Sequence, residues 1–189
     1  MIKIAVVGDI GSGKSHIAKL FGYPVFNADH EVASIYKKNK DCFKRLKKSL
    51  PKYFSVFPAN KIQIIKAIKD SEKNLKKITK IVHPEVKKKL SIFLKKNKKR
   101  KAIILDIPLL LENKLNQKND IIIFVQSKKS EIIKRLKKRD NFNLNLYNQF
   151  KKIQLPLSYK KKKSNHIIKN NFTNKFVKTS VKKILKEII

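Results

Sequence analysis

The chain has 189 residues, 41% of them hydrophobic, which suits one compact domain with a core of ordinary size. Cys42 is the only cysteine, and this excludes an internal disulfide and a cysteine zinc site. No run approaches the roughly 20 apolar residues that cross a bilayer, and the first residues lack the pattern of a signal peptide. We therefore expect a cytoplasmic protein without a membrane partner.

The charge is strongly positive, with 48 basic residues against 13 acidic ones and a formal net charge of +35. Such a field attracts polyanions, among them nucleotides and nucleic acids. However, the excess is almost entirely lysine, whereas proteins that read bases rely on arginine and interleaved aromatic residues. We therefore favour compositional drift over a dedicated nucleic-acid partner.

The hydrophobic pattern predicts strands that alternate with helices. In chain order we expect a strand over 2–7, a helix over 14–21, a strand over 23–27, a helical segment over 30–100, strands over 102–105 and 121–125, a helix over 131–138, a partly helical segment over 140–155, a strand over 166–168 and a helix over 175–189. This alternation favours an α/β fold, with a parallel sheet covered by helices on both faces.

The segment between the first strand and the first helix, from Gly8 to Ser15, matches the phosphate-binding pattern G-x-x-x-x-G-K-[ST]. Small residues let backbone N–H groups surround phosphate oxygens, and the following helix turns its positive end toward them. Lys14 is expected to contact the β- and γ-phosphates of ATP, and Ser15 to ligate Mg²⁺. The residues expected at the nucleotide are Asp9, Ile10, Gly11, Ser12, Gly13, Lys14, Ser15 and His16.

Two aspartates follow predicted strands at the carboxyl edge of the sheet, where open α/β sheets bind their ligands. Asp29 either orients an acceptor hydroxyl or caps the helix expected from His30, and the residues alone favour neither. Asp106 either holds the water shell of Mg²⁺ or caps the next turn.

Two of the four arginines, Arg135 and Arg139, lie one helical turn apart on the basic helix. Their planar side chains suit phosphate oxygens, although a solvated helix face is the alternative. Because the N-K-x-D motif of GTPases is absent, these features favour a small P-loop kinase.

The whole set of motifs resembles the dephospho-CoA kinase family over nearly the full length. The matching segments are the loop, with Asp9 where the family has a second glycine, Asn27-Ala28-Asp29 for D-A-D, Ile81 to Pro84 for an apolar pair followed by H-P, Pro108 to Glu112 for P-L-L-F-E, Arg135 to Arg139 for R-L-x-x-R, and Gln154, Lys160 and Ile167 to Asn170 for the tail.

This resemblance implies that ATP phosphorylates the 3′-hydroxyl of dephospho-CoA, the last step of coenzyme A biosynthesis. It implies a P-loop NTPase-type three-layer fold with a five-stranded parallel sheet in the order 2-3-1-4-5, a helical CoA-domain insertion and a helical lid. We accordingly assign residues 1–29, 101–138 and 156–189 to the nucleotide-binding core, 30–100 to the acceptor subdomain and 139–155 to the lid, in a protein expected to be monomeric.

The resemblance also implies residue roles. Asp29 matches the catalytic aspartate, Arg139 the lid arginine, Arg135 a neighbouring phosphate contact and Asn170 a position beside the adenine. The matches to motifs near the acceptor site are His83, Pro108, Leu109 and Glu112. A helix start before Pro84 and a helix cap would explain His83 and Glu112 equally well.

The chain departs from the family pattern at several positions. Asn27 replaces an aspartate, His16 a threonine and Phe150 an arginine, for which Lys151 or Lys152 could substitute. The competing hypotheses are another small P-loop kinase, with a nucleoside monophosphate or similar acceptor, and a nucleic-acid-binding ATPase.

Overall fold

The computed structural model describes residues 1–138 and 142–189. It divides into two compact units. The first unit combines Met1–Asn27 with Asn97–Ile189, and the second is Ala28–Lys96.

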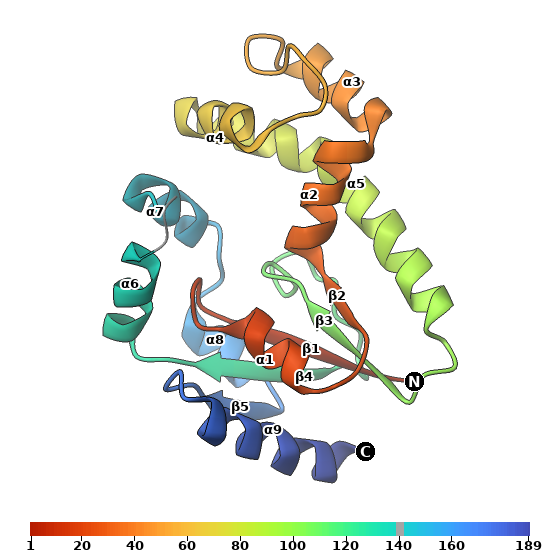
Figure 1. Cartoon of the computed structure of the whole chain (residues 1–189), viewed down its shortest axis with the longest axis vertical. Helices are drawn as coiled ribbons and strands as arrows, with labels where there is room; N and C mark the ends of the chain where they lie inside the picture. Colours follow the sequence, from red (N-terminus) through yellow and green to blue (C-terminus); the bar gives the residue numbers. More distant parts are fainter. Residues whose placement is uncertain (139–141) are drawn as a thin grey trace. The chain divides into compact units, whose positions relative to one another are not determined.

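The first unit is built on a five-stranded parallel sheet in the order β2-β3-β1-β4-β5 (Figure 1). Its strands are β1 (Ile2–Gly8), β2 (Val25–Asn27), β3 (Ala102–Asp106), β4 (Ile121–Gln126) and β5 (His166–Lys169). The central strands are buried on both faces, which is why they appear in the sequence as continuous apolar runs. The predicted fold class and strand order are confirmed.

Helices cover both faces of this sheet. α1 (Lys14–Leu20) and α9 (Asn174–Ile188) pack on one face, where Ile17 and Val181 join Ile4, Val6 and Ile123 in a buried apolar cluster. α8 (Leu157–Lys162) packs against β1 from the other face (Figure 1). The strands run in one direction, so their carboxyl ends, and the segments that follow them, meet at a single edge.

Two further helices, α6 (Lys129–Lys137) and α7 (Leu144–Lys152), form a smaller apolar cluster. Ile132 and Leu136 of α6 pack there with Tyr147 of α7. The expected lid segment therefore contains one helix, α7, in its described part, and α8 follows it after a short turn.

The second unit, residues 28–96, is described in full, and it contains four helices and no strand. Its helices are α2 (Ala28–Lys38), α3 (Lys40–Ser49), α4 (Lys61–Asp70) and α5 (Glu72–Lys96). Pro84 lies inside α5, so the alternative of a helix start before Pro84 is wrong. An interior proline costs about 3 kcal/mol. We attribute the continuity of α5 to its packing against all three other helices of this unit.

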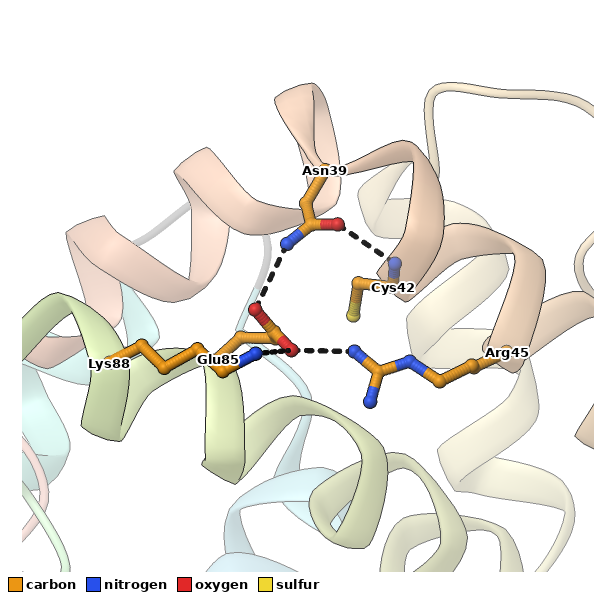
Figure 2. A network of polar contacts seen from close by, with 5 residues as sticks. All are labelled: Asn39, Cys42, Arg45, Glu85 and Lys88. Carbon is orange, nitrogen blue, oxygen red and sulfur yellow. Dashed lines mark hydrogen bonds and ion pairs between the residues drawn. The ribbon is translucent and has the colours of Figure 1, made fainter.

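A polar network joins α3 to α5 within the second unit (Figure 2). The Glu85 carboxylate accepts hydrogen bonds from Arg45 Nη2 at 2.7 Å, Lys88 Nζ at 3.2 Å and Asn39 Nδ2 at 3.3 Å. Asn39 also caps α3 by accepting the Cys42 N–H at 2.8 Å. The hydrogen bond from Arg45 is the main reason why the pKa of Glu85 lies below its ordinary value.

Among the described residues, no helix is both long and apolar enough to span a membrane.

Candidate active site

The loop between β1 and α1 closes on the carbonyl oxygen of Asp9. Lys14 Nζ donates a hydrogen bond to this oxygen at 2.6 Å, and the Ser12 N–H donates to it at 3.2 Å. Lys14 is buried although it is charged, so its ammonium group is fixed inside the loop. The predicted loop thus has the geometry in which the lysine and the helix N-terminus can act together on one phosphate chain.

Asn170, at the end of β5, fixes the second half of the loop. It is buried, and its side chain donates to the Ser12 carbonyl oxygen at 2.8 Å and accepts the Phe172 N–H at 2.8 Å. Gly13 has a φ of 92°, and a Cβ atom added there would lie 2.4 Å from Asn170 Nδ2. Glycine at this position is therefore required both by the backbone conformation and by the approach of Asn170. The contact of Asn170 with adenine stays a prediction.

Asp106 ends β3, the strand next to β1, and is buried. Its Oδ2 atom accepts a hydrogen bond from Asn27 Nδ2 at 2.6 Å. Asn27 stands where the family pattern has an aspartate. An aspartate here would place a second negative charge beside Asp106, and the neutral amide avoids the repulsion between the two carboxylates. The departure at Asn27 therefore leaves one carboxylate, held in a fixed orientation, at this edge of the sheet.

The donor set at this edge fits Mg²⁺. Ser15 lies exposed in the first turn of α1 and offers a hydroxyl, while Asp106 offers a carboxylate, both hard oxygen ligands. The described residues contain no cluster of three His, Cys, Asp or Glu side chains able to hold a metal. A magnesium ion here would accordingly depend on phosphate oxygens and water for most of its ligands, as is usual at phosphate sites.

Helix α6 packs directly on the loop. A Cβ atom on Gly11 would lie 3.1 Å from side-chain atoms of Ile132 and Leu136. Arg135, on the exposed side of this helix, places its guanidinium carbon 4.5 Å from the centroid of the Phe172 ring. Arg135 is therefore stacked on an aromatic face rather than simply solvated. Arg139, the predicted lid arginine, lies outside the described residues.

His16 contacts the closing helix of the same unit. Its Nε2 atom lies 2.9 Å from Asn174 Oδ1 at the start of α9, and its side chain is exposed. The predicted contact between His16 and the nucleotide is not tested by this hydrogen bond.

Glu112 lies in the turn that follows β3, after the half-buried Pro108 and Leu109. Its Oε1 atom accepts from Lys160 Nζ at 2.7 Å and from the Leu155 N–H at 3.0 Å. Lys160 is 1% exposed and also donates to Gln154 Oε1 at 3.2 Å. The structure thus brings Glu112, which the sequence analysis matched to the P-L-L-F-E motif, together with Gln154 and Lys160, which it matched to the tail.

Two predicted site residues belong to the second unit. Asp29 is exposed and is the second residue of α2, so it does not hold the cap position that the sequence analysis considered. His83 is half-buried on α5, where burial and the neighbouring Lys87 lower its pKa. His83 is therefore mainly neutral at pH 7, since the ordinary value is already 6.5.

Sequence reasoning did not find the residue that faces Asp9. Lys151 of α7 places its Nζ atom 3.3 Å from Asp9 Oδ2, and it was named only as one of two possible substitutes for an arginine. The residues are 142 positions apart, and no local pattern marks one lysine among so many.

Together the parallel sheet and its phosphate loop, with a buried lysine, define a P-loop nucleotide-binding protein. The family model described as dephospho-CoA kinase matches residues 2–175. A curated dephospho-CoA kinase from the Wolbachia endosymbiont of Brugia malayi is 33% identical over 187 residues, covering 96% of this chain and 95% of the relative. The chain belongs to the dephospho-CoA kinase family.

Solved structures agree with this fold. The crystal structure of TT1252 from Thermus thermophilus is similar with a TM-score of 0.78 and 25% identity, covering 100% of this chain and 98% of the other. A dephospho-CoA kinase from Campylobacter jejuni is similar with a TM-score of 0.66 and 21% identity, covering 98% and 96%. The family predicted from the motifs is confirmed.

Proposed function

We propose that this chain transfers the γ-phosphoryl group of ATP to the 3′-hydroxyl of dephospho-CoA, the final step of coenzyme A biosynthesis. The observation that carries the proposal is the loop closed by Lys14 on the Asp9 carbonyl and fixed by Asn170, in a chain that belongs to the dephospho-CoA kinase family. Its proposed setting is the cytoplasm, where it would act as a monomer.

The loop and its neighbours bind the phosphates in this proposal. Lys14 and the loop N–H groups hold the β- and γ-phosphates, while Ser15 and Asp106 hold Mg²⁺ directly or through water. When bound, the ion neutralises charge on the transferring phosphoryl group. The hydrogen bond from Asn27 fixes one oxygen of Asp106 and leaves the other for this role.

Asp29 is the proposed catalytic base. It follows the last residue of β2 by two positions, and its exposed carboxylate is able to accept a proton. In the reaction it accepts a hydrogen bond from the 3′-hydroxyl and takes the proton as the new P–O bond forms and the bond to ADP breaks. Arg135 and Arg139 stabilise the developing charge when the lid segment closes.

The proposed acceptor residues are His83 and the turn that contains Pro108, Leu109 and Glu112. Because His83 is mainly neutral at pH 7, it binds as a hydrogen-bonding group rather than as a cation. Glu112 already uses Oε1 for Lys160, and its Oε2 atom is buried and has no hydrogen-bond partner in the described part of the chain, so Oε2 is the oxygen left for a further interaction.

A direct assay tests the reaction. The protein is mixed with ATP, Mg²⁺ and dephospho-CoA, and coenzyme A is quantified against a panel that includes nucleoside monophosphates. Phosphorylation of another acceptor in place of dephospho-CoA would refute the proposed substrate.

A variant pair tests the base. We expect Asp29→Asn to lower kcat by a factor of at least about 100 with the ATP affinity unchanged, since general-base catalysis contributes on this scale. The control is Asp41→Asn, which removes an exposed carboxylate from α3 and should leave kcat unchanged. Normal turnover by the Asp29 variant would show that another group accepts the proton.

A further inference from the structure

Asp9 is an unusual residue for a loop that receives a triphosphate. Its carboxylate is 8% exposed, and its Oδ1 atom accepts the N–H of the next residue, Ile10, at 2.8 Å. Its carbonyl oxygen is the acceptor for Lys14, the residue expected at the β- and γ-phosphates. The negative charge of Asp9 therefore belongs to the same residue whose carbonyl oxygen holds Lys14, close to where the β- and γ-phosphates of ATP are expected. By itself this charge would weaken the binding of ATP.

Lys151 of α7 compensates this charge. Its Nζ atom lies 3.3 Å from Asp9 Oδ2 and donates a second hydrogen bond to the Tyr147 hydroxyl, also at 3.3 Å. Burial lowers the pKa of Lys151, but the hydrogen bond to Tyr147 and the charge of Asp9 outweigh it, so the pKa lies above its ordinary value. Lys151 is thus a protonated, oriented cation beside the phosphate loop.

The ammonium group has capacity left for a ligand. It carries three N–H donors, of which two are used by Asp9 and Tyr147. The third has no hydrogen-bond acceptor in residues 1–138 and 142–189, although the ammonium group also lies 5.6 Å from the centroid of the Tyr147 ring. The side chain is 39% exposed, so solvent and solutes can reach it. An anionic phosphate oxygen is a suitable acceptor for a charge-assisted hydrogen bond of this kind.

We propose that Lys151 is a phosphate-binding residue of this kinase and that Asp9 is the positioning residue that holds it over the loop. The inference rests on the proposed function, because it takes ATP as the ligand of the loop. Asp9 thereby serves two purposes, with its carbonyl oxygen fixing Lys14 and its carboxylate fixing Lys151 on the lid side.

Binding of Mg²⁺ and the non-hydrolysable analogue AMP-PNP tests this assignment by calorimetry, without any acceptor substrate. We expect Lys151→Ala to weaken AMP-PNP binding by about tenfold or more and Lys151→Arg to restore most of it, because a charged hydrogen bond is lost and then replaced. The control is Lys162→Ala, which removes one exposed lysine of α8 and should bind AMP-PNP normally.

Asp9→Asn separates a direct contact from simple charge compensation. The asparagine keeps an acceptor for the Ile10 N–H but removes the negative charge. If Lys151 binds phosphate, adding Lys151→Ala to Asp9→Asn still weakens AMP-PNP binding, by about threefold or more. If Lys151 only neutralises Asp9, the second substitution has no effect, and the proposal is refuted.

Thermal unfolding of Lys151→Ala without nucleotide tests whether Lys151 has only a structural role. A loss of thermal stability in Lys151→Ala together with unchanged AMP-PNP affinity would overturn the proposal. Failure of the unmodified protein to bind AMP-PNP would refute this inference and the proposed function together, whereas normal binding by Lys151→Ala refutes this inference alone.

Discussion

Replacing Lys160 by methionine, which has a similar length, should strongly destabilise the first unit. Lys160 is 1% exposed and lies 2.7 Å from Glu112, which is 10% exposed. Without the ammonium group, the Glu112 carboxylate keeps only the Leu155 N–H at 3.0 Å as a partner in the described residues. Removing one member of a buried ion pair costs about 3–5 kcal/mol. For a chain of this size the expected decrease in Tm is roughly 10 °C.

Urea unfolding, followed by circular dichroism, measures this loss. The matched control is Lys162→Met on the same helix, which is exposed and should change stability by less than about 0.5 kcal/mol. Adding Glu112→Gln to Lys160→Met removes the uncompensated charge while keeping an acceptor for Leu155, and should recover at least about 2 kcal/mol. Unchanged stability in Lys160→Met, or a double variant less stable than the single one, would refute the reasoning.

Three further predictions follow from individual contacts. The hydrogen bond from Arg45 lowers the pKa of Glu85 below 4.5, so the ionised carboxylate stabilises the fold above that pH and this stabilisation is lost as the pH falls below it. Urea titrations should find Glu85→Gln about 1 kcal/mol less stable than the unmodified protein at pH 7, and the difference should shrink toward about pH 3. Burial raises the pKa of the Cys42 thiol, so iodoacetamide should modify it at least about tenfold more slowly in the native protein than in urea, and equal rates would contradict its burial. Gly13→Ala should weaken AMP-PNP binding roughly tenfold in calorimetry, because the added Cβ must displace Asn170; unchanged affinity would show that the loop adapts.

The strands of the sheet could be predicted from the sequence because each is marked by its own residues, whereas their order was implied by the family resemblance. Each central strand is a short apolar run, and the loop from Gly8 to Ser15 marks the first strand and helix without reference to the rest of the chain. The start of α2 was predicted two residues late, near His30 rather than at Ala28. The side chain of Asn27 is engaged with Asp106, and the chain enters the helix directly after this strand residue.

The partners of the buried charges could not be predicted in the same way. Glu112 and Lys160 are 48 positions apart, and Asp9 and Lys151 are 142 apart. With 48 basic residues in the chain, an acidic residue has many possible partners, and only the packed structure selects one. The prediction of a helix start before Pro84 was wrong for a related reason. The local rule that proline interrupts a helix was overridden here by the packing of α5 against its neighbouring helices.

The position of Pro84 has a further consequence for the motions of the second unit. Proline has no amide proton, so the carbonyl oxygen of Lys80 loses its helical donor and the hydrogen-bond ladder of α5 has a gap at this point. We therefore expect amide hydrogen exchange to give different protection factors before and after Pro84, because local opening can begin at this gap. His83 and Glu85 flank this gap, one a half-buried imidazole and the other the anchor of α3. Opening at this gap would therefore loosen both the site proposed for the acceptor at His83 and the attachment of α3 through Glu85.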